Sequence, residues 1–423
     1  MPSLDRERAA AMTETLQDRL VATVEDDLDR RTILKALGGL TAAGGAITGS
    51  AAATDGQRGT GASGFEENGH FAEVGGYRDR SFDPHAFLTT FNTGRDGQDS
   101  LDQTVYEEDE RTVRHFQFTA LKSTITIAPG IEFPAWSYNG QVPGPTIRAV
   151  EGDLIRVTFD NLHVHDHTIH PHLRNLDPVM DGIPSNGPGS IDVDDDPFTY
   201  EWIAQPAGCH LYHCHSLPLK AHILRGLYGA IIVDPDPERV REHPRDYVNY
   251  HGPITDHLRH TLYARAKTRN YERPENDAVN EMVIVMNGFD TNFDGENEVY
   301  AANTRAFAYG LADTDGEGSW SGGETVHPIT VDKDTIQRIY LINTTEFDPI
   351  NSFHSHSQFF DYYDHGTTLF PTHSTVDTIM QCQAQRGIVE LDYRDHQPGL
   401  YMVHAHQSEF AELGWMSFLE VTD

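Results

Sequence analysis

Four pairs of histidines, each with one residue between its members, restrict the fold of this 423-residue chain more than any other feature. In a β-strand, residues two apart project to the same face, so each pair places two imidazoles side by side, about 7 Å apart. Each of two strand-rich segments has one pair early and one pair just before its final strand. The chain is therefore expected to contain two similar β units with four histidines each. The pairs are His170 and His172, His213 and His215, His354 and His356, and His404 and His406.

The sequence around these pairs favours β-structure. From Thr112 onward, short runs of Val, Ile, Thr, Phe and Tyr alternate with Gly, Pro and Asn, at the spacing typical of β-sandwiches. We predict an all-β fold with a first sandwich at 112–235 and a second at 281–423. The polar segment 236–280 is interpreted as a linker or a long excursion with one helix.

The N-terminal region resembles an export signal. The pair Arg30-Arg31 precedes a short Gly/Ala-rich apolar run and the small residues Ala51 to Ala53, a pattern similar to twin-arginine signals. The run is too short and too glycine-rich for a stable membrane span. Residues 1–53 are predicted to be a signal region, which predicts a location outside the cell or at its surface. Residues 54–111 are predicted to form an acidic, Gly-rich extension.

The charge balance excludes some partners. Acidic residues number 65 against 31 basic ones, a formal net charge of −34, which argues against binding to nucleic acid or to anionic membranes. This acidic surface resembles that of halophilic proteins, because high salt screens the repulsion among carboxylates. With three cysteines the chain is not a disulfide scaffold. Cys209 and Cys382 are interpreted as inert thiols, with a bridge between them as the alternative.

Cys214 lies between His213 and His215 and would point to the opposite face of the strand. A thiolate with two imidazoles and a weak axial ligand is the donor set of a blue copper centre. His222 follows at a suitable distance in the sequence, and Leu227 stands at the axial place, where its side chain cannot ligate. These residues predict a copper site of high potential, with zinc as the alternative metal and a buried cysteine beside surface histidines as the structural alternative.

Further motifs resemble those of the multicopper oxidases, from about Thr112 to Asp423. They are Asn139-Gly140-Gln-Val-Pro143-Gly144-Pro145 with Gly152-Asp153, His167-Thr-Ile-His170-Pro-His172, and Met180-Asp181-Gly182. The resemblance implies two cupredoxin-like Greek-key domains and four coppers per chain. It implies a type 1 site at His167, Cys214 and His222 and a type 2 site at His170 and His354. The implied type 3 ligands are His172, His213, His215, His356, His404 and His406.

The sequence also departs from the pattern of the larger members of that family. Ala405 and Asn351 stand where a second type 1 site would need cysteine and histidine, so the second domain is expected to lack one. This resembles the two-domain oxidases, which implies a homotrimer with copper clusters between subunits. A cluster completed by the two domains of one chain is the alternative. His165 is an alternative to His167, because its spacing from His170 matches copper nitrite reductases.

The resemblance implies an oxidase that takes single electrons from a phenol-like or metal-ion reductant and reduces dioxygen to water. Cys214, His213 and His215 would carry the electrons, and Asp181 and Glu409 are candidates to supply protons. The alternatives are a copper nitrite reductase, which would not need His215, His356 or His406, and a copper electron carrier, which would consume no oxygen. The turn Asp290 to Gly295 resembles the front of a calcium loop, but Ala301 stands where that loop needs glutamate, so we interpret it as an acidic turn.

Overall fold

The computed structural model of this chain describes residues 103–128, 131–272, 279–306 and 328–423. The predicted signal region at 1–53 and most of the predicted extension at 54–111 lie outside the described residues. The described end of that extension supplies one exposed strand, β1 (Thr104–Glu108), which pairs with the start of β2 (Arg111–Ala128). No helix within the described ranges is long and apolar enough to cross a membrane.

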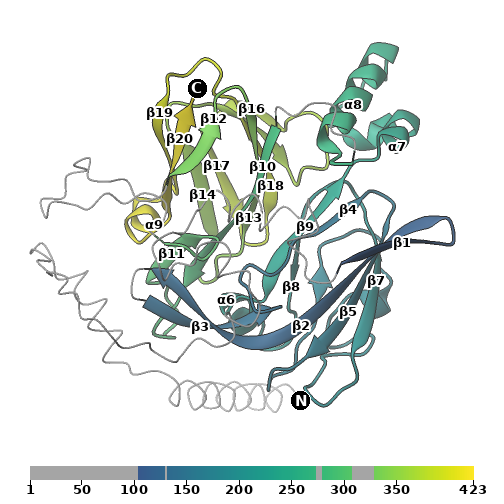
Figure 1. The fold of residues 1–423 in the computed structure, drawn as a ribbon, viewed down its shortest axis with the longest axis vertical. Helices are drawn as coiled ribbons and strands as arrows, with labels where there is room; N and C mark the ends of the chain where they lie inside the picture. The colour runs from purple at the N-terminus through teal and green to yellow at the C-terminus, as the bar shows by residue number, and fades with distance from the viewer. Residues whose placement is uncertain (1–102, 129–130, 273–278, 307–327) are drawn as a thin grey trace, which may run out of the picture.

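The first sandwich consists of two facing sheets (Figure 1). In one, the strand order is β1, β2, β5 (Leu154–Asn161) and β7 (Phe198–Ile203), and β3 (Ile131–Tyr138) also pairs with β2. The other has the order β4 (Ile147–Val150), β9 (Tyr228–Asp234), β8 (Gly208–His213) and β6 (His170–Pro171). Along β5, buried residues alternate with half-buried ones, the pattern of a strand with one face on the core.

The second sandwich has the same two-layer form. One sheet has the order β11 (Val299–Ala302), β10 (Val279–Phe289), β13 (Ile336–Asn343), β18 (Arg386–Leu391), β15 (Phe360–Asp364) and β16 (His373–Val376). The other has the order β12 (Ile329–Asp332), β20 (Met416–Thr422), β19 (Gly399–His404), β14 (Ile350–Ser355) and β17 (Thr378–Cys382). The all-β class predicted from the sequence is confirmed.

Both sandwiches pair their histidine-bearing strands in the same way. His170 pairs with His213 between β6 and β8, and His354 pairs with His404 between β14 and β19. In each sandwich the strand that ends in the late histidine pair leads through a short helix, α6 (Leu219–Leu224) or α9 (Ser408–Glu412), into the last strand. The repeated histidine pattern therefore corresponds to a repeated structural unit.

The polar segment between the sandwiches contains α7 (Pro237–Glu242), the 3₁₀ turn η3 (Pro244–Tyr247) and α8 (Asp256–Arg269). Thr255 caps α8, because its hydroxyl accepts a hydrogen bond of 3.2 Å from the backbone N–H of Leu258. Figure 1 shows α7 and α8 together at one side of the two sandwiches. α8 buries Leu262 and Ala266 in a small apolar cluster with Leu369 of the second sandwich.

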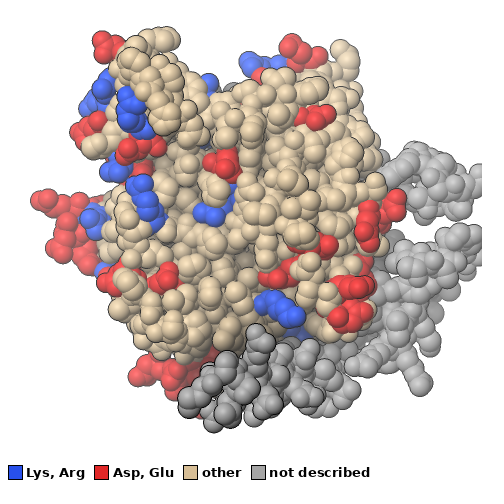
Figure 2. All heavy atoms as spheres, turned by 180° about the vertical axis from the view of Figure 1, so that it is seen from behind, with Lys and Arg blue, Asp and Glu red and all other residues tan. Residues whose placement is uncertain are grey.

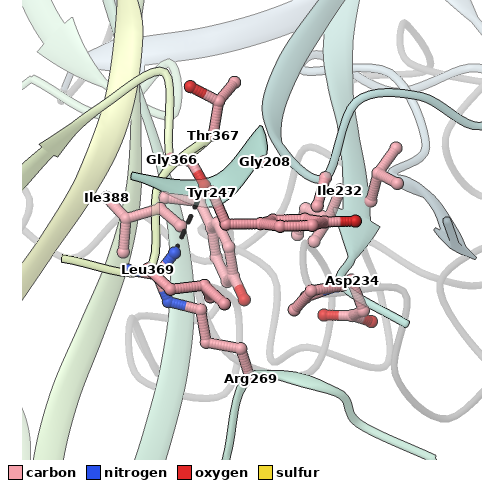
Figure 3. A pocket seen from close by; sticks show the side chains of 13 residues that line it. Gly208, Ile232, Asp234, Tyr247, Arg269, Gly366, Thr367, Leu369 and Ile388 are labelled. Carbon is pink, nitrogen blue, oxygen red and sulfur yellow. Dashed lines mark hydrogen bonds between the residues drawn. The ribbon is translucent and has the colours of Figure 1, made fainter. Parts of the chain in front are cut away.

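The two sandwiches share a packed seam. One apolar cluster contains Leu211 and Ile232 of the first sandwich together with Val283 and Ile388 of the second. A cavity of only about 10 Å³ remains nearby, roughly the space of a single water molecule. Figure 3 shows this cavity, where the Arg269 guanidinium donates a hydrogen bond of 3.2 Å to a backbone carbonyl of the second sandwich.

A buried ion network crosses the same seam. Arg148, on β4, is 1% exposed, and its guanidinium lies 2.9 Å from Asp234 of its own sandwich and 2.9 Å from Glu281 of the other. Glu281 in turn lies 3.2 Å from Arg338, which lies 2.9 Å from Glu390. Each charge in this low-dielectric region has a partner of opposite sign, which buried ions require.

Candidate metal centres

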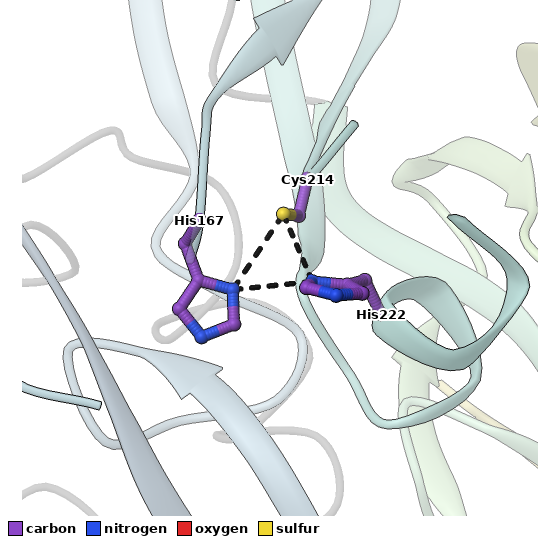
Figure 4. A group of neighbouring side chains, drawn as sticks. All are labelled: His167, Cys214 and His222. Atoms are coloured by element: carbon purple, nitrogen blue, oxygen red, sulfur yellow. Dashed lines mark hydrogen bonds between the residues drawn. The ribbon is translucent and has the colours of Figure 1, made fainter. Parts of the chain in front are cut away.

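A cysteine and two histidines converge in the first sandwich. The Cys214 Sγ atom lies 3.2 Å from His222 Nδ1 and 3.6 Å from His167 Nδ1, and the two nitrogens are 3.2 Å apart. Figure 4 shows these three buried side chains directed at a common point. One ion with ligand bonds of about 2 Å would bridge donors at this spacing. A thiolate with two imidazoles fits copper, so the donor set suits the predicted type 1 site.

The structure brings His167, rather than its alternative His165, to this point. The ring of His165 lies against Trp136 instead, with ring centroids 4.7 Å apart. Backbone bonds fix the other two donors, because the Cys214 N–H donates to the Leu227 carbonyl at 3.0 Å and the Leu227 N–H donates to the His222 carbonyl at 3.2 Å. Leu227 follows both donors in the chain, is fully buried, and has no donor atom in its side chain.

Burial keeps these imidazoles neutral. Together with other histidines nearby, burial lowers the pKa of His167 to about 2 and the pKa of His222 to about 3. Neutral imidazole is the form that binds a metal ion. Burial also raises the pKa of the Cys214 thiol, so the metal itself must stabilise the thiolate.

The two histidine pairs of the first sandwich form a second group, with His170 and His172 at β6 and His213 and His215 at the end of β8, next to Cys214. The Nε2 atoms of His172 and His213 are 3.1 Å apart, and the His170 ring lies 5.3 Å from the ring of His215. His170 Nδ1 is 2.7 Å from the Asp181 carbonyl oxygen, and His213 Nδ1 is 2.8 Å from the carbonyl of Cys214. These acceptors place the proton on Nδ1, which leaves Nε2 free for a metal.

The second sandwich repeats this arrangement. The Nε2 atoms of His356 and His404 are 3.0 Å apart, and the His354 ring lies 4.9 Å from the ring of His406. The Nδ1 atom of His354 lies 2.8 Å from the Asp377 carbonyl, and that of His404 lies 2.5 Å from the carbonyl of the next residue. Each sandwich thus presents four clustered imidazoles, and in each set two of them have an Nδ1 acceptor that leaves Nε2 available.

Sequence models of the multicopper oxidase family match this chain over residues 119–238 and 290–423. A solved multicopper oxidase structure is 41% identical, covers 80% of this chain and 97% of its own, and superimposes with a TM-score of 0.61. The chain belongs to the multicopper oxidase family. It is therefore an oxidoreductase with a cupredoxin-like fold, as the motifs predicted.

Curated relatives of the oxidase match smaller regions. The copper-containing nitrite reductase of Neisseria meningitidis serogroup B is 33% identical over 118 residues, 27% of this chain and 28% of that protein. The L-ascorbate oxidase of Cucumis sativus is 40% identical over 104 residues, 24% of this chain and 17% of that protein. The matches thus span less than a third of these relatives. The predicted relation to nitrite reductases is confirmed as a distant one.

The oxidase keeps its two sets of four histidines apart within one chain. Ring contacts link the histidines inside each set, and none of these contacts among the described residues joins one set to the other. The first set lines a cavity of about 450 Å³. The second sandwich lines this cavity with Thr344, Glu346, Gln383 and Ala384, not with its histidines.

In the second sandwich, apolar side chains stand at the positions of Cys214 and His222. The Ala405 N–H donates to the Trp415 carbonyl at 3.2 Å, and the Trp415 N–H donates to the Phe410 carbonyl at 2.9 Å. These bonds repeat those of Cys214, Leu227 and His222, so Phe410 occupies the position of His222. Ala405 and Asn351 are both buried, and the described residues of this sandwich hold no thiolate with two imidazoles.

The two predicted proton donors differ in position. Asp181 follows the 3₁₀ turn η2 (Pro178–Met180), and its carboxylate lies 3.3 Å from His170 Nδ1. Glu409 is exposed on α9. Asp181 therefore stands directly beside one set of histidines, whereas no hydrogen bond or ion pair within the described part of the chain joins the Glu409 side chain to the other set. Cys209 and Cys382 are free thiols, in line with the interpretation that they are inert.

The predicted acidic turn is compact. Carboxylate oxygens of Asp290, Asp294 and Glu298 lie within 4.8 Å of one another, and backbone N–H groups of the turn donate to Asp290. The third carboxylate comes from Glu298, not from the position of Ala301. Its hydrogen bonds are made within the turn, with Thr291 and Asn292, so the interpretation as an acidic turn stands.

Three further residues of the site were not predicted from the sequence. The ring of Trp136 lies within 4.7–5.7 Å of His163, His165, His167 and His222. His163 Nδ1 lies 2.8 Å from His167 Nε2 and so can orient that ring. Arg386, of the second sandwich, contacts the Nδ1 atom of His172 at 3.4 Å. The spacing of His163, His165 and His167 was the only sequence signal for any of them.

Proposed function

We propose that this oxidase couples one-electron oxidation of a reducing substrate to the four-electron reduction of dioxygen to water. The observation that carries this proposal is the strand end His213-Cys214-His215. It directs one thiolate towards His167 and His222 and two imidazoles towards His170 and His172. Copper bound at these groups would supply one-electron transfer at the type 1 site and dioxygen binding at the histidines.

The chain itself connects the two groups. Cys214 Sγ is joined to its own carbonyl by covalent bonds, and that carbonyl accepts the 2.8 Å hydrogen bond from His213 Nδ1. This continuous path favours electron transfer from the buried thiolate to the first set of histidines. Asp181, at 3.3 Å from His170, is well placed to hold a proton for the water that forms, and we assign Glu409 the same role beside the second set.

We propose that the oxidase assembles as a homotrimer in which the first set of histidines in one subunit meets the second set in its neighbour. Three observations support this arrangement. The two sets are apart within one chain, the cavity at the first set is about 450 Å³, and His356 and His406 are exposed. A head-to-tail contact of this kind closes into a ring. Four coppers per chain would result.

The remaining proposals concern the protein's surroundings. The twin-arginine pattern in residues 1–53 supports export of the folded protein to the cell surface or beyond. The net charge of −34 supports a saline medium, and Figure 2 shows acidic side chains at several places on one face of the molecule. The electron donor is a reducing substrate of the phenol, metal-ion or protein class.

The deciding experiment measures copper per chain and oxygen uptake after copper loading of the full chain in high salt. Four coppers, a blue absorption band and oxygen uptake with hexacyanoferrate(II) are expected. The control is Cys382→Ser, which removes an exposed thiol that is remote from the histidines in the sequence and should change none of these results. Two coppers with nitrite reduction would favour a nitrite reductase, and one copper without oxygen uptake would favour an electron carrier.

A further inference from the structure

The three most exposed large apolar side chains among the described residues lie on the two loops that carry the type 1 residues. Leu162 is 65% exposed and Val164 is 76% exposed, beside His163 and His165, while Leu217 is 78% exposed between Cys214 and His222. Exposed apolar groups that gather at one place mark interaction sites. We name Leu162, Val164 and Leu217 the apolar rim.

The two loops of the apolar rim are held together by Trp136, whose ring contacts His163 and His165 of one loop and His222 of the other. Trp136 is only 8% exposed, and the guanidinium of Arg225 lies 5.1 Å from its ring on another side. His167 is 0% exposed and His222 is 2% exposed. A donor therefore meets Trp136, His165 and the apolar rim before it meets a type 1 imidazole.

An acidic loop borders the apolar rim. A backbone bridge between His167 and Ile191 and a 2.8 Å hydrogen bond between Ser190 and Ser216 attach this loop to both ligand loops. The carboxylates of this loop are exposed and follow Ile191 directly in the sequence, so they lie beside the loop that carries His167. The guanidinium of Arg225 lies instead at the ring of Trp136, 5.1 Å from its centroid. The carboxylates of this loop are Asp192, Asp194, Asp195 and Asp196.

We propose that the electron donor is a small one-electron redox protein, with an apolar contact surface around its redox centre and a basic side that faces the acidic loop. This proposal rests on the proposed function, since it names the substrate class of the same site. The small rim suits a transient electron-transfer contact, which typically buries less than about 1,200 Å², rather than a permanent subunit contact. The acidic loop would steer a basic donor and fix its orientation.

The electron balance is that of the proposed reaction. Four donor molecules each lose one electron, which crosses the Trp136 region to the type 1 site, and one dioxygen takes up four electrons and four protons to form two waters. No bond forms between donor and oxidase. A donor can therefore deliver its electron by contact with the rim alone, because the electron passes through the packed rings of Trp136, His165 and His222.

The test compares a reduced basic c-type cytochrome with hexacyanoferrate(II) as donors to the full, copper-loaded chain. The variant is the double substitution Val164→Ser with Leu217→Ser, and the matched control is Val105→Ser with Leu400→Ser, two exposed apolar residues elsewhere. The rim variant should lose at least about tenfold in kcat/KM for the cytochrome, equivalent to about 1.4 kcal/mol. In the rim variant, the rate of hexacyanoferrate(II) oxidation and the intensity of the blue absorption band should stay within about twofold of the wild type. In the control variant, the rates with both donors should stay within the same limit.

A second readout does not depend on turnover. The oxidised cytochrome should bind the copper-free full chain, and the Kd should rise at least about tenfold in the rim variant. In the double variant Asp192→Asn with Asp195→Asn, the Kd for the cytochrome should depend less steeply on salt concentration. Unchanged cytochrome kinetics and binding in the rim variant, or an equal loss for both donors, overturns the proposal. Oxygen uptake with hexacyanoferrate(II) alone overturns the docking proposal and keeps the oxidase. Cytochrome oxidation without oxygen uptake keeps the docking proposal and overturns the oxidase.

Discussion

The two sandwiches share one backbone plan and differ in what fills the position of the type 1 site. In the first, donor atoms of His167, Cys214 and His222 lie within 4.8 Å of one another. In the second, the same backbone bonds connect Ala405, Phe410 and Trp415, and the Phe410 ring stacks on Tyr300 with centroids 3.9 Å apart. The comparison teaches that the same pattern of backbone bonds can support either a group of metal donors or apolar packing.

The strongest test of this difference is to place serine at the two equivalent positions, Cys214 and Ala405. Cys214→Ser removes the thiolate, so the blue absorption should vanish and oxygen uptake should fall by more than the roughly 100-fold that loss of a ligand's supporting partner costs. Ala405→Ser adds a buried hydroxyl and should cost no more than about 3 kcal/mol of stability, with the blue band unchanged. Absorption spectra, oxygen uptake and thermal unfolding should be measured for both variants. A blue, active Cys214→Ser protein would refute the assignment.

The two histidine sets can be compared by mixing subunits. His172→Ala disables the first set and His356→Ala disables the second, so each variant alone should be inactive. If the sets meet between subunits, co-refolded mixtures should recover about a quarter of wild-type oxygen uptake, because one contact in four joins two intact sets in random trimers. No recovery in the mixture, with intact trimers, would indicate closure within one chain.

A third comparison concerns Trp415 and Leu227, which hold equivalent places. Trp415→Ala should lower the free energy of unfolding by about 3–5 kcal/mol, because it empties a fully buried position. Leu227→Met nearly conserves volume and should cost less than about 1.5 kcal/mol. A thioether at the axial place should also lower the potential of the type 1 site. Denaturant unfolding tests the two stability changes, and a redox titration of the blue band tests the change in potential. An unchanged potential in Leu227→Met would contradict the assignment of Leu227 to the axial position.

The smallest effect is expected where the second sandwich lines the cavity of the first set. Burial raises the pKa of Glu346 to about 6 from an ordinary value of 4.5, against the effects of Gln383 and Lys220. A raised pKa in the folded state makes stability fall as pH rises from about 4.5 through 6. Glu346→Gln should therefore be more stable than the wild type by about 1–2 kcal/mol at pH 7.5 and equal to it at pH 4.5. A pH-independent difference in unfolding would contradict this.

The sequence predicted those parts of the site that depend on local periodicity. The alternation of side chains along a strand is enough to place His213 and His215 opposite Cys214, and the family motifs add His167 and His222. The structure also shows what no local pattern carries. Trp136 reaches the type 1 residues from another strand, and Arg386 meets His172 across 214 residues of chain. Such contacts arise from how the sheets pack, which spacing alone does not encode.

The sandwich boundaries were predicted from composition, because strand-forming runs differ clearly from the polar segment between them. The helices α7 and α8 were less evident, since α8 buries only a few of its 14 residues and shows little apolar periodicity. The separation of the two histidine sets within a chain could not be predicted at all. It depends on the orientation of one sandwich against the other, which the long-range contacts of the seam determine.

The ion network at the seam has a consequence for how such a protein can be divided. A gene fragment that encodes only the blue copper half would leave Arg148 without Glu281, and loss of one member of a buried ion pair costs about 3–5 kcal/mol. Separate halves would keep the Arg148–Asp234 and Arg338–Glu390 pairs, so new residues would be required at Arg148 and, in the other half, at Glu281. Each half therefore depends on the other for the charge balance of its interior.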